Sequence, residues 1–277
     1  MSSALTTTSR YASRTGWLPA RGPASAVRTN GQPPGFTPAA LASNGLPEAG
    51  TVLVVTARPG CESADLGALL YAYGQAGARL ALLSLTRGEA SPVNSTCSRL
   101  ETVRPWELQL ASWLLGISSL AVADYPDGGL RDCQLWDLTA RVQRAIADYH
   151  PDLILVPDPA TGDCDDAQVA RAVCLAAQSA GVPVAARTTR AAPDGWPIDL
   201  GPLTQAARTA QRAAASAHAS QADTLPEVLA GLDSLGSHEQ LRWLRPAVVA
   251  APRVIPPCAP VERRHRVILR VGLTQAG

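Results

Sequence analysis

The sequence predicts an α/β fold in which a mainly parallel β-sheet is flanked by helices on both faces. From residue 51 onward, short apolar runs alternate with longer segments of helical periodicity. Several of these runs are continuously apolar, which is typical of strands buried on both faces of a parallel sheet. Regular alternation of strands and helices is the pattern of right-handed βαβ units, which together cover both faces of one sheet with helices.

The first half of the predicted domain holds three strands and two helices. "TVLVVTA" and "RLALLSLT" are continuous apolar runs, and "SLAVADY" is a shorter one. Between them lie an Ala- and Leu-rich segment that ends at Gly77 and an amphipathic segment with Pro105 near its first turn. Glycine after the end of a helix and proline near its start are common helix boundaries. The predicted strands are 51–57, 79–86 and 119–125, and the predicted helices are 64–77 and 104–116.

The second half continues the alternation and then becomes less regular. "PDLILVPDP" and "VPVAART" are the fourth and fifth apolar runs, and a helical segment with a glycine stop at Gly181 joins them. A long Ala-rich helix follows, then a second short helix and an expected edge strand near the end of the chain. The predicted strands are 151–159, 182–188 and 263–273, and the predicted helices are 135–150, 166–181, 203–221 and 225–236.

Residues 1–48 differ in composition from the rest of the chain. They are rich in Ser, Thr, Pro, Gly and Ala, and they contain four arginines but a single acidic residue, Glu48. No helical or strand periodicity is present, so we expect a disordered or loosely packed arm. Residues 49–277 are expected to form one α/β domain. An Arg- and Ser-rich, acid-poor start also resembles a transit peptide, although its Pro and Gly content breaks any amphipathic helix.

Composition excludes some classes of function. A net charge of +1 argues against a nucleic-acid-binding protein, which needs a concentrated basic face. No apolar run approaches the roughly 18 residues of a membrane span, so no membrane partner is expected. The six cysteines form no CxxC pair, which with no secretory signal favours reduced thiols and a cytoplasmic location. The chain has no lysine and is rich in Ala and Pro, which indicates the codon bias of a GC-rich genome and suggests a bacterial source.

A ligand site is expected beyond the carboxyl ends of the strands, where open α/β sheets bind their ligands. If the first predicted strand lies beside the fourth, the loops "ARPGCES" and "PDPATGDCDDAQ" meet there. We call the space between these two loops the crevice. The second loop carries Asp158, Asp163, Asp165 and Asp166 around Cys164. Helix capping and first-turn acids explain some of these carboxylates, but four in nine residues are denser than capping requires.

With both loops placed, residues 51–222 resemble the PIG-L/LmbE family, the N-acetylglucosaminyl-phosphatidylinositol de-N-acetylase-like proteins. "VLVVTARPGCESADLGALL" is similar to the segment that carries the family's AHPDDE motif, and "TGDCDDAQVARAV" to the segment of its HPDH motif. "SLTRGEA", "VRPWELQLASWLLGI", "YPDGGL" and "AHASQ" resemble further family elements, in the family's order. The resemblance implies a Rossmann-like fold and zinc-dependent amidase or deacetylase activity.

This sequence departs from the family at the positions that carry the chemistry. By resemblance, the first zinc-binding His and the zinc-binding Asp of AHPDDE correspond to Arg58 and Cys61, and the general base corresponds to Gly60. The zinc-binding His of HPDH corresponds to Asp166, its first His to Asp163, and Asp165 keeps the family's identity. Because arginine cannot ligate a cation and glycine cannot accept a proton, we expect no metal ligands and no cofactor.

Charge suggests how the fold tolerates these replacements. Without a metal ion, the carboxylates of the crevice need another positive partner. We therefore hypothesise that Arg58 pairs with Asp163 or Asp166 in forked geometry. Cys61 and Cys164, on the two converging loops, suggest a redox pair or a thiolate metal site, while the simpler interpretation is two unrelated small residues.

Five further residues are candidates for binding a polar ligand such as an amino sugar. They lie beside the crevice by resemblance, and their alternatives are loop-shaping or structural hydrogen bonds; they are Arg87, Glu89, Asp127, Asp158 and His218. Neither a G-x-G-x-x-G dinucleotide loop nor a G-x-S-x-G nucleophile elbow is present.

Two classes of function follow. The first is a pseudoenzyme that binds a small ligand or a protein partner. The second is an active N-acyl amino-sugar or thiol-sugar deacetylase, with a metal site rebuilt around Cys61, Asp163 and Asp166 or a metal-free mechanism that uses Asp165 or His218. A relic with no selected role is a third interpretation.

Overall fold

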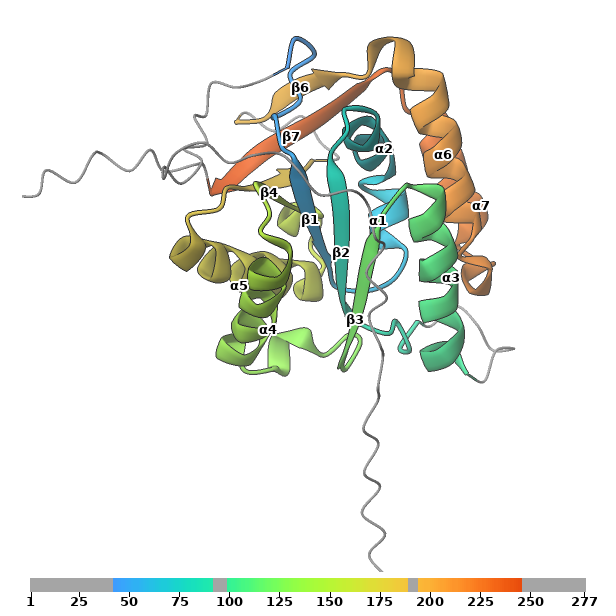
Figure 1. Ribbon diagram of the computed structural model, residues 1–277. Helices are drawn as coiled ribbons and strands as arrows, with labels where there is room; N and C mark the ends of the chain where they lie inside the picture. The colour runs from blue at the N-terminus through green and yellow to red at the C-terminus, as the bar shows by residue number, and fades with distance from the viewer. Residues whose placement is uncertain (1–41, 92–98, 189–193, 246–277) are drawn as a thin grey trace, which may run out of the picture.

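The computed structural model describes residues 42–91, 99–188 and 194–245. These residues build one mixed sheet in the strand order β3-β2-β1-β4-β5-β7-β6 (Figure 1). Five strands are parallel, and β7 runs antiparallel to both of its neighbours. The strands are β1 (Thr51–Thr56), β2 (Arg79–Thr86), β3 (Ser119–Tyr125), β4 (Leu153–Val156), β5 (Val184–Arg187), β6 (Trp196–Asp199) and β7 (His238–Arg245).

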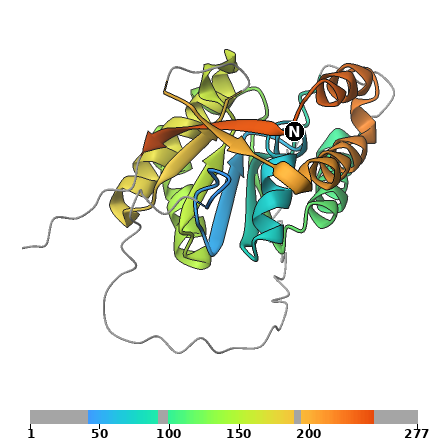
Figure 2. The same ribbon diagram turned by 90° about the horizontal axis from the view of Figure 1, so that it is seen from above.

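Helices cover both faces of the sheet, as the sequence predicts (Figures 1 and 2). One apolar layer lies under α1, α2, α3 and α6, and the other lies under α4 and α5. The side chains of β1 alternate between the two layers, so Val52 faces the first and Leu53 the second. The helices are α1 (Cys61–Ala64), α2 (Gly67–Gln75), α3 (Leu100–Leu114), α4 (Leu135–Tyr149), α5 (Cys164–Ala180), α6 (Thr204–Ser216) and α7 (Leu225–Asp233).

The strand order reverses between β1 and β4, and this places the crevice. Strand β1 pairs in parallel with β2 on one side and with β4 on the other. The first strand therefore lies beside the fourth, as the site prediction required. The carboxyl ends of β1 and β4 meet at one edge, and the loops that follow them face each other.

Two strands differ from the sequence prediction, which contains neither β6 nor β7. Strand β6 has four residues and includes Pro197, so it gives almost no periodic signal. Strand β7 is half-buried, and one of its two inward positions holds the charged Glu239 rather than an apolar residue. The predicted edge strand 263–273 lies outside the described residues.

The helix prediction needs three corrections. The predicted helix 104–116 begins four residues earlier, at Leu100, so Pro105 lies inside α3 rather than near its start. The predicted helix 64–77 is divided into α1 and α2, because Asp65 and Leu66 separate the two segments. The predicted helix 203–221 ends at Ser216, and His218 has φ −83° and ψ 56°, which is not helical. His218 therefore does not lie on the Ala-rich helix but directly after it, where its ring reaches α1.

The last residues of the predicted arm pack against the domain. Leu46 is 4% exposed and belongs to the first apolar layer, and Trp196 Nε1 donates to the Gly45 carbonyl. Residues 1–41 lie outside the described part, so the boundary between arm and domain at residue 48 stays a prediction. None of the described helices is long and apolar enough to cross a membrane.

Candidate functional site

Arg58 occupies the centre of the crevice and forms a forked ion pair with Asp163. Its Nη1 lies 2.8 Å from Asp163 Oδ2 and its Nη2 lies 3.1 Å from Asp163 Oδ1. Arg58 follows β1, and Asp163 precedes α5, so the pair joins the two loops that meet beyond the sheet. This arrangement matches one of the two pairings hypothesised from the sequence, the one with Asp163 rather than Asp166.

The same guanidinium contacts two further carboxylates. Arg58 Nε donates to Asp127 Oδ1 at 3.1 Å, and Nη2 lies 3.7 Å from Asp165 Oδ2. Burial lowers the pKa of Arg58, but its hydrogen bond with Asp163 and the nearby negative charges outweigh burial and raise that pKa. For Asp163, burial opposes ionisation, but the contacts with Arg58 lower the pKa below its usual value. Arg58 and Asp163 are therefore both charged at neutral pH.

Asp163 and Asp165 also organise the backbone around the crevice. Asp163 is the N-cap of α5, where its carboxylate accepts from the amides of Asp165 and Asp166. Asp165 is 1% exposed and accepts from the amides of Gly128 and Leu130, in the loop after β3. Both carboxylates thus serve the fold as well as the charge balance.

Asp166 lies on the other side of Asp163 and has no such partners. Its residue is 8% exposed, and its Oδ1 is buried without a hydrogen-bond partner among the described residues. Burial and the charge of Asp163 raise the pKa of Asp166 to about 7. Burial is also the main cause that raises the pKa of the Cys61 thiol, and the nearby charge of Asp166 adds to this effect. Burial likewise raises the pKa of Asp65 to about 6. This side of the crevice is a set of acids that hold their protons more tightly than usual.

Below the loop after β1, Glu62 and His218 form a buried pair. Glu62 Oε1 lies 2.8 Å from His218 Nε2 and also accepts from Ser63 Oγ, while Oε2 accepts from the Gly60 amide. Burial raises the pKa of Glu62, but the proximity of His218 and these hydrogen bonds bring it below its usual value. His218 is 3% exposed. These contacts fit the structural role that sequence analysis gave as the alternative to ligand binding. In this role His218 ties the end of α6 to α1.

The three candidates on the loops after β2 and β3 bond to other protein groups. Arg87 Nε donates to Asp124, Glu89 accepts from the Asp127 amide, and Asp127 Oδ2 accepts from the Ala90 amide. These contacts shape the two loops and hold Asp127 against Arg58. Asp158 caps the turn after β4 and forms an ion pair with Arg242 of β7 at 2.9 Å.

Two arginines that sequence reasoning does not select complete the surroundings of the crevice. Arg104 of α3 is 3% exposed and donates to the carbonyls of Gly88 and Pro59 at 2.5 and 2.6 Å. It therefore clamps the loops after β2 and β1 together. Arg104 could have been selected from the sequence, because a basic residue on the apolar side of a predicted amphipathic helix indicates a buried charge with a specific partner. For Arg242 no signal was available, because β7 itself was not predicted.

The donor atoms of the crevice do not form a metal-binding group. Within the described part of the chain, no cluster of three or more His, Cys, Asp and Glu side chains is arranged to hold a metal ion. Cys61 and Cys164 are both free thiols, one partly exposed and one exposed. The side chain at position 58, which faces the carboxylates, brings a positive charge into the centre.

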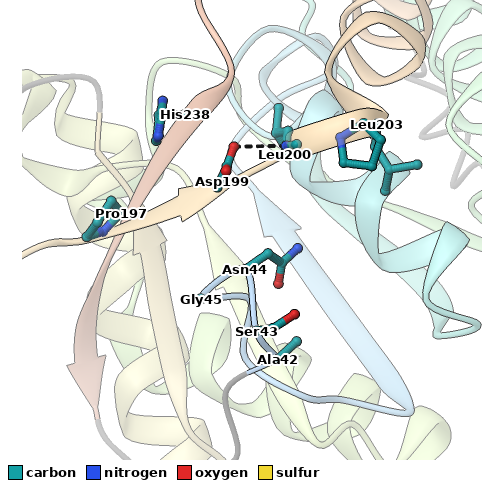
Figure 3. Close-up of a pocket in the computed structure, with 11 residues that line it drawn as sticks. Ala42, Ser43, Asn44, Gly45, Pro197, Asp199, Leu200, Leu203 and His238 are labelled. Atoms are coloured by element: carbon teal, nitrogen blue, oxygen red, sulfur yellow. Dashed lines mark hydrogen bonds between the residues drawn. The ribbon is translucent and has the colours of Figure 1, made fainter.

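One cavity among the described residues lies away from the crevice, beside the edge strand β6. It has a volume of about 690 Å³ and lies between the segment before β1 and the segment around β6, with Asn44, Asp199 and His238 as polar lining residues (Figure 3). Each of these has a local partner: Asn44 Oδ1 accepts from the Leu46 amide, Asp199 from the Gly201 amide, and His238 contacts Ser237. The crevice remains the candidate site because the carboxyl ends of β1 and β4 meet there, where open α/β sheets bind their ligands.

Comparison with known proteins gives one family. Residues 53–177 match the family model "PIG-L: GlcNAc-PI de-N-acetylase". This range contains the two crevice loops and the helix that carries Arg104. No protein of curated function matches the sequence.

Several solved structures share the fold. The conserved protein TT1542 from Thermus thermophilus has a TM-score of 0.57 and 21% identity over 73% of this chain and 97% of its own. The A40926 pseudoaglycone deacetylase Dbv21 has a TM-score of 0.53 and 19% identity, over 74% and 99%. The N,N'-diacetylchitobiose deacetylase from Pyrococcus horikoshii has a TM-score of 0.53 and 16% identity, over 72% and 85%. At these identities the likeness establishes the α/β fold.

Proposed function

The chain carries a PIG-L family domain, and on that premise we propose that it is a non-hydrolytic member that binds a ligand or a protein partner through the crevice. The observation that supports this is the forked pair between Arg58 and Asp163. It supplies a fixed positive charge to the carboxylates at the centre of the crevice. In this proposal the ion pair replaces the metal ion as the group that holds the crevice loops together.

The residues at the family's zinc positions do not fit zinc. A hydrolytic zinc site requires about three neutral or anionic protein ligands and an open position for water. Arg58 offers no lone pair, and its guanidinium would repel a dication at close range. Cys61 and Asp166 remain as possible ligands, but both hold their protons more tightly than usual, which disfavours metal binding. Gly60 has no side chain to take a proton from water.

The ligand that we propose is small and polar, such as an amino sugar. Two deacetylases among the similar structures are named for the pseudoaglycone of the antimicrobial reagent A40926 and for N,N'-diacetylchitobiose. Partly exposed polar groups of Arg58, Asp163 and Cys61 border the crevice and offer donors and acceptors for hydroxyl and amide groups. The expected location is the cytoplasm, which suits the free thiols of the described cysteines.

The first test is metal content. Protein purified without a His-tag is incubated with excess zinc, desalted and analysed by elemental mass spectrometry. We expect substoichiometric zinc, close to the background of a buffer blank. A stoichiometry near one zinc per chain that falls when Cys61 or Asp166 is replaced would contradict the proposal and indicate a rebuilt metal site.

The second test restores the family residues. The variant Arg58→His, Cys61→Asp, Asp166→His restores three zinc ligands, and we expect it to bind about one zinc per chain. The general base is restored separately by adding Gly60→Asp, because Gly60 has φ 105°, where a side chain is strained. Amidase activity on N-acetyl amino sugars in the fourfold variant, and none in the wild type, would support a retained ligand pocket.

One observation favours the alternative function, an active hydrolase without metal. The sequence suggested Asp165 or His218 for such a mechanism, and both are buried and form hydrogen bonds within the protein. Asp166 is the better candidate, because its Oδ1 is buried without a partner among the described residues and a carboxyl group with a pKa of about 7 is suited to general acid–base catalysis. Hydrolysis of N-acetyl amino sugars by metal-free wild-type protein, lost in Asp166→Asn but kept in Asp148→Asn on the exposed side of α4, would favour this alternative.

A further inference from the structure

Helix α3 presents an uncovered apolar face. Trp106, Leu110 and Trp113 are 70%, 50% and 74% exposed. Their spacing of four and three residues places them on one side of the helix, since residues three and four apart are neighbours on a helix surface. The opposite side of α3 is buried in the first apolar layer through Leu108 and Ala111. Helix α3 is thus apolar on its outer face as well as its inner one, and the described part of the chain leaves that outer face largely open to solvent.

We propose that this face, Trp106–Leu110–Trp113, is the contact surface between two copies of this chain. The stripe is nearly symmetric about Leu110, with one tryptophan four residues before it and one three residues after it. When two such helices pack antiparallel about a two-fold axis, each Trp106 meets the partner's Trp113 and the two Leu110 side chains meet at the axis. A two-fold contact requires such a self-complementary patch.

The area suits a reversible dimer. Aromatic side chains bury roughly 150–250 Å² each, so Trp106 and Trp113 together offer roughly 300–500 Å² per copy, or about 600–1,000 Å² in two copies, and Leu110 adds to this. The polar side chains that border the stripe, such as Thr102 and Gln109, add to this and bring the contact to the roughly 1,000 Å² that a specific interface needs. Tryptophan is also among the residues that contribute most to binding energy at interfaces.

Charge argues against a membrane surface as the occupant. Helices that lie on membranes pair an apolar face with flanking Lys and Arg, which attract anionic lipids. The basic residue of α3 is Arg104, which is buried and bonded to two carbonyls. At the start of α3 the exposed N-cap residue Arg99 is balanced by the exposed Glu101. A surround without net positive charge suits another copy of the chain better than an anionic lipid surface.

The neighbouring sheet edge does not offer an alternative contact of equal quality. Strand β3 ends the sheet of described strands, next to α3. Its outer edge carries Asp124, whose side chain is 82% exposed and paired with Arg87. Charged residues on an edge strand disfavour pairing with a further strand. The contact is therefore expected through the helix rather than through a continuous sheet.

Sedimentation velocity on full-length protein, from low micromolar to a few hundred micromolar concentration, tests the proposal. We expect a monomer–dimer equilibrium in the wild type and a dissociation constant raised about tenfold or more in Trp113→Ser. Trp136→Ser is the matched control, because Trp136 is 69% exposed and lies on α4, which covers the other face of the sheet. Equal melting temperatures of the two variants exclude a folding defect. A wild type that stays monomeric throughout, including one that binds lipid vesicles through Trp113, overturns the proposal.

A cross-link tests the two-fold geometry. In Leu110→Cys, the new thiols of the two copies face each other, so mild oxidation with copper–phenanthroline joins them in a disulfide-linked dimer. Leu175→Cys is the control, because Leu175 is 46% exposed on α5 and lies away from α3. The wild type sets the background from its six native cysteines. Equal cross-linking of the two variants would show that the dimer does not form through α3.

Discussion

At the scale of single residues, the crevice is governed by how positive charge is distributed among carboxylates. Arg58 bonds to Asp163 and Asp127 and lies near Asp165, whereas Asp166, Cys61 and Asp65 lie beyond its direct reach. The contacts with Arg58 lower the pKa of Asp163, whereas burial raises the pKa values of Asp166, Cys61 and Asp65, which hold their protons to higher pH. The guanidinium therefore separates carboxylates that it contacts directly from acids whose burial disfavours ionisation.

Replacing Arg58 should destabilise the protein. Arg58→Gln keeps a polar side chain but leaves Asp163 and Asp127 without their cation, and the Arg58–Asp163 pair is only about one-third exposed, with side-chain exposures of 27% and 32%. Unpaired, partly buried carboxylates cost about 2 kcal/mol after allowance for solvent screening. Urea unfolding at pH 7 measures the loss. Arg144→Gln on the exposed side of α4 is the control and should change stability by less than about 0.5 kcal/mol.

Asp166 should make stability fall as the pH rises. Its pKa is about 7 in the folded protein and 3.8 in the unfolded chain, so between these values the folded state holds a proton that the unfolded state has released. The contribution of Asp166 is largest below about pH 4 and is lost as the pH rises through about 7. The full shift is worth at most about 4 kcal/mol.

The measurement compares Asp166→Asn with the wild type. Urea unfolding at pH 5 and pH 8 should show a smaller loss of stability between the two values in Asp166→Asn, because the amide does not titrate. Asp148→Asn should behave as the wild type does. Other groups, such as Glu62 and Asp163 with their lowered pKa values, act in the opposite direction, so the difference between variants carries the test rather than the absolute slope. Identical pH dependence in all three proteins would refute the assignment.

At the scale of elements, α3 fixes the geometry of the crevice from its inner face. Arg104 bonds to carbonyls of the loops after β1 and β2, and Gly88 has no room for a side chain because an added Cβ would lie 2.5 Å from Arg104 Nη1. The loops are thus shaped around a buried guanidinium. The position of Arg58 depends on this support, since Arg58 directly precedes Pro59, whose carbonyl Arg104 holds.

Removing this clamp should destabilise both loops. Arg104→Met keeps the apolar stem but leaves the carbonyls of Gly88 and Pro59 without their donors, which costs about 2–4 kcal/mol. Hydrogen exchange should show faster exchange in residues 57–63 and 86–90, with little change in α5. Arg171→Met on the exposed side of α5 serves as the control. Unchanged exchange in both loops would show that they are held by other contacts.

The elements that sequence reasoning predicts correctly are those with a strong apolar signal. Strands β1 and β2 lie within one residue of their predicted bounds. An uninterrupted apolar run is typical of a strand buried on both faces, and the polar residues at its two ends mark where the strand begins and ends. Strand β7 was missed because its inward positions are Glu239 and Leu241, and a buried carboxylate hides the period of two. Charge balance predicts that Arg58 pairs with Asp163 or Asp166, and the structure decides for Asp163. The contact of Asp158 with Arg242 depends on β7 and was not foreseeable.

At the scale of the whole molecule, Glu239 joins three elements. Its carboxylate on β7 accepts from Arg187 Nε of β5 at 2.8 Å and also pairs with Arg208 of α6, and its side chain is 1% exposed. The antiparallel strand, the last parallel strand and the covering helix thus depend on one buried charge. Strand β7, which sequence analysis did not predict, is attached to the predicted strand β5 and the predicted helix α6 through this network.

Neutralising Glu239 should weaken the whole molecule. Glu239→Gln leaves Arg187 and Arg208 without a counter-charge, and breaking a buried pair in this way costs about 3–5 kcal/mol. Thermal unfolding should therefore occur at a clearly lower temperature than in the wild type. Glu227→Gln, at an exposed position on α7, is the matched control. A melting temperature equal to that of the control would mean that water or other groups compensate the two arginines.

Asp163 has two structural roles, and these roles make positions 58 and 163 depend on each other when either is mutated. Its carboxylate caps α5 and at the same time neutralises Arg58, so the two residues depend on each other. A single replacement at position 58 loses stability before it gains a metal ligand, and Gly60 at φ 105° resists a carboxylate. A change at position 58 is therefore tolerated best when position 163 changes with it. We expect the effects of substitutions at these two positions to be coupled rather than additive.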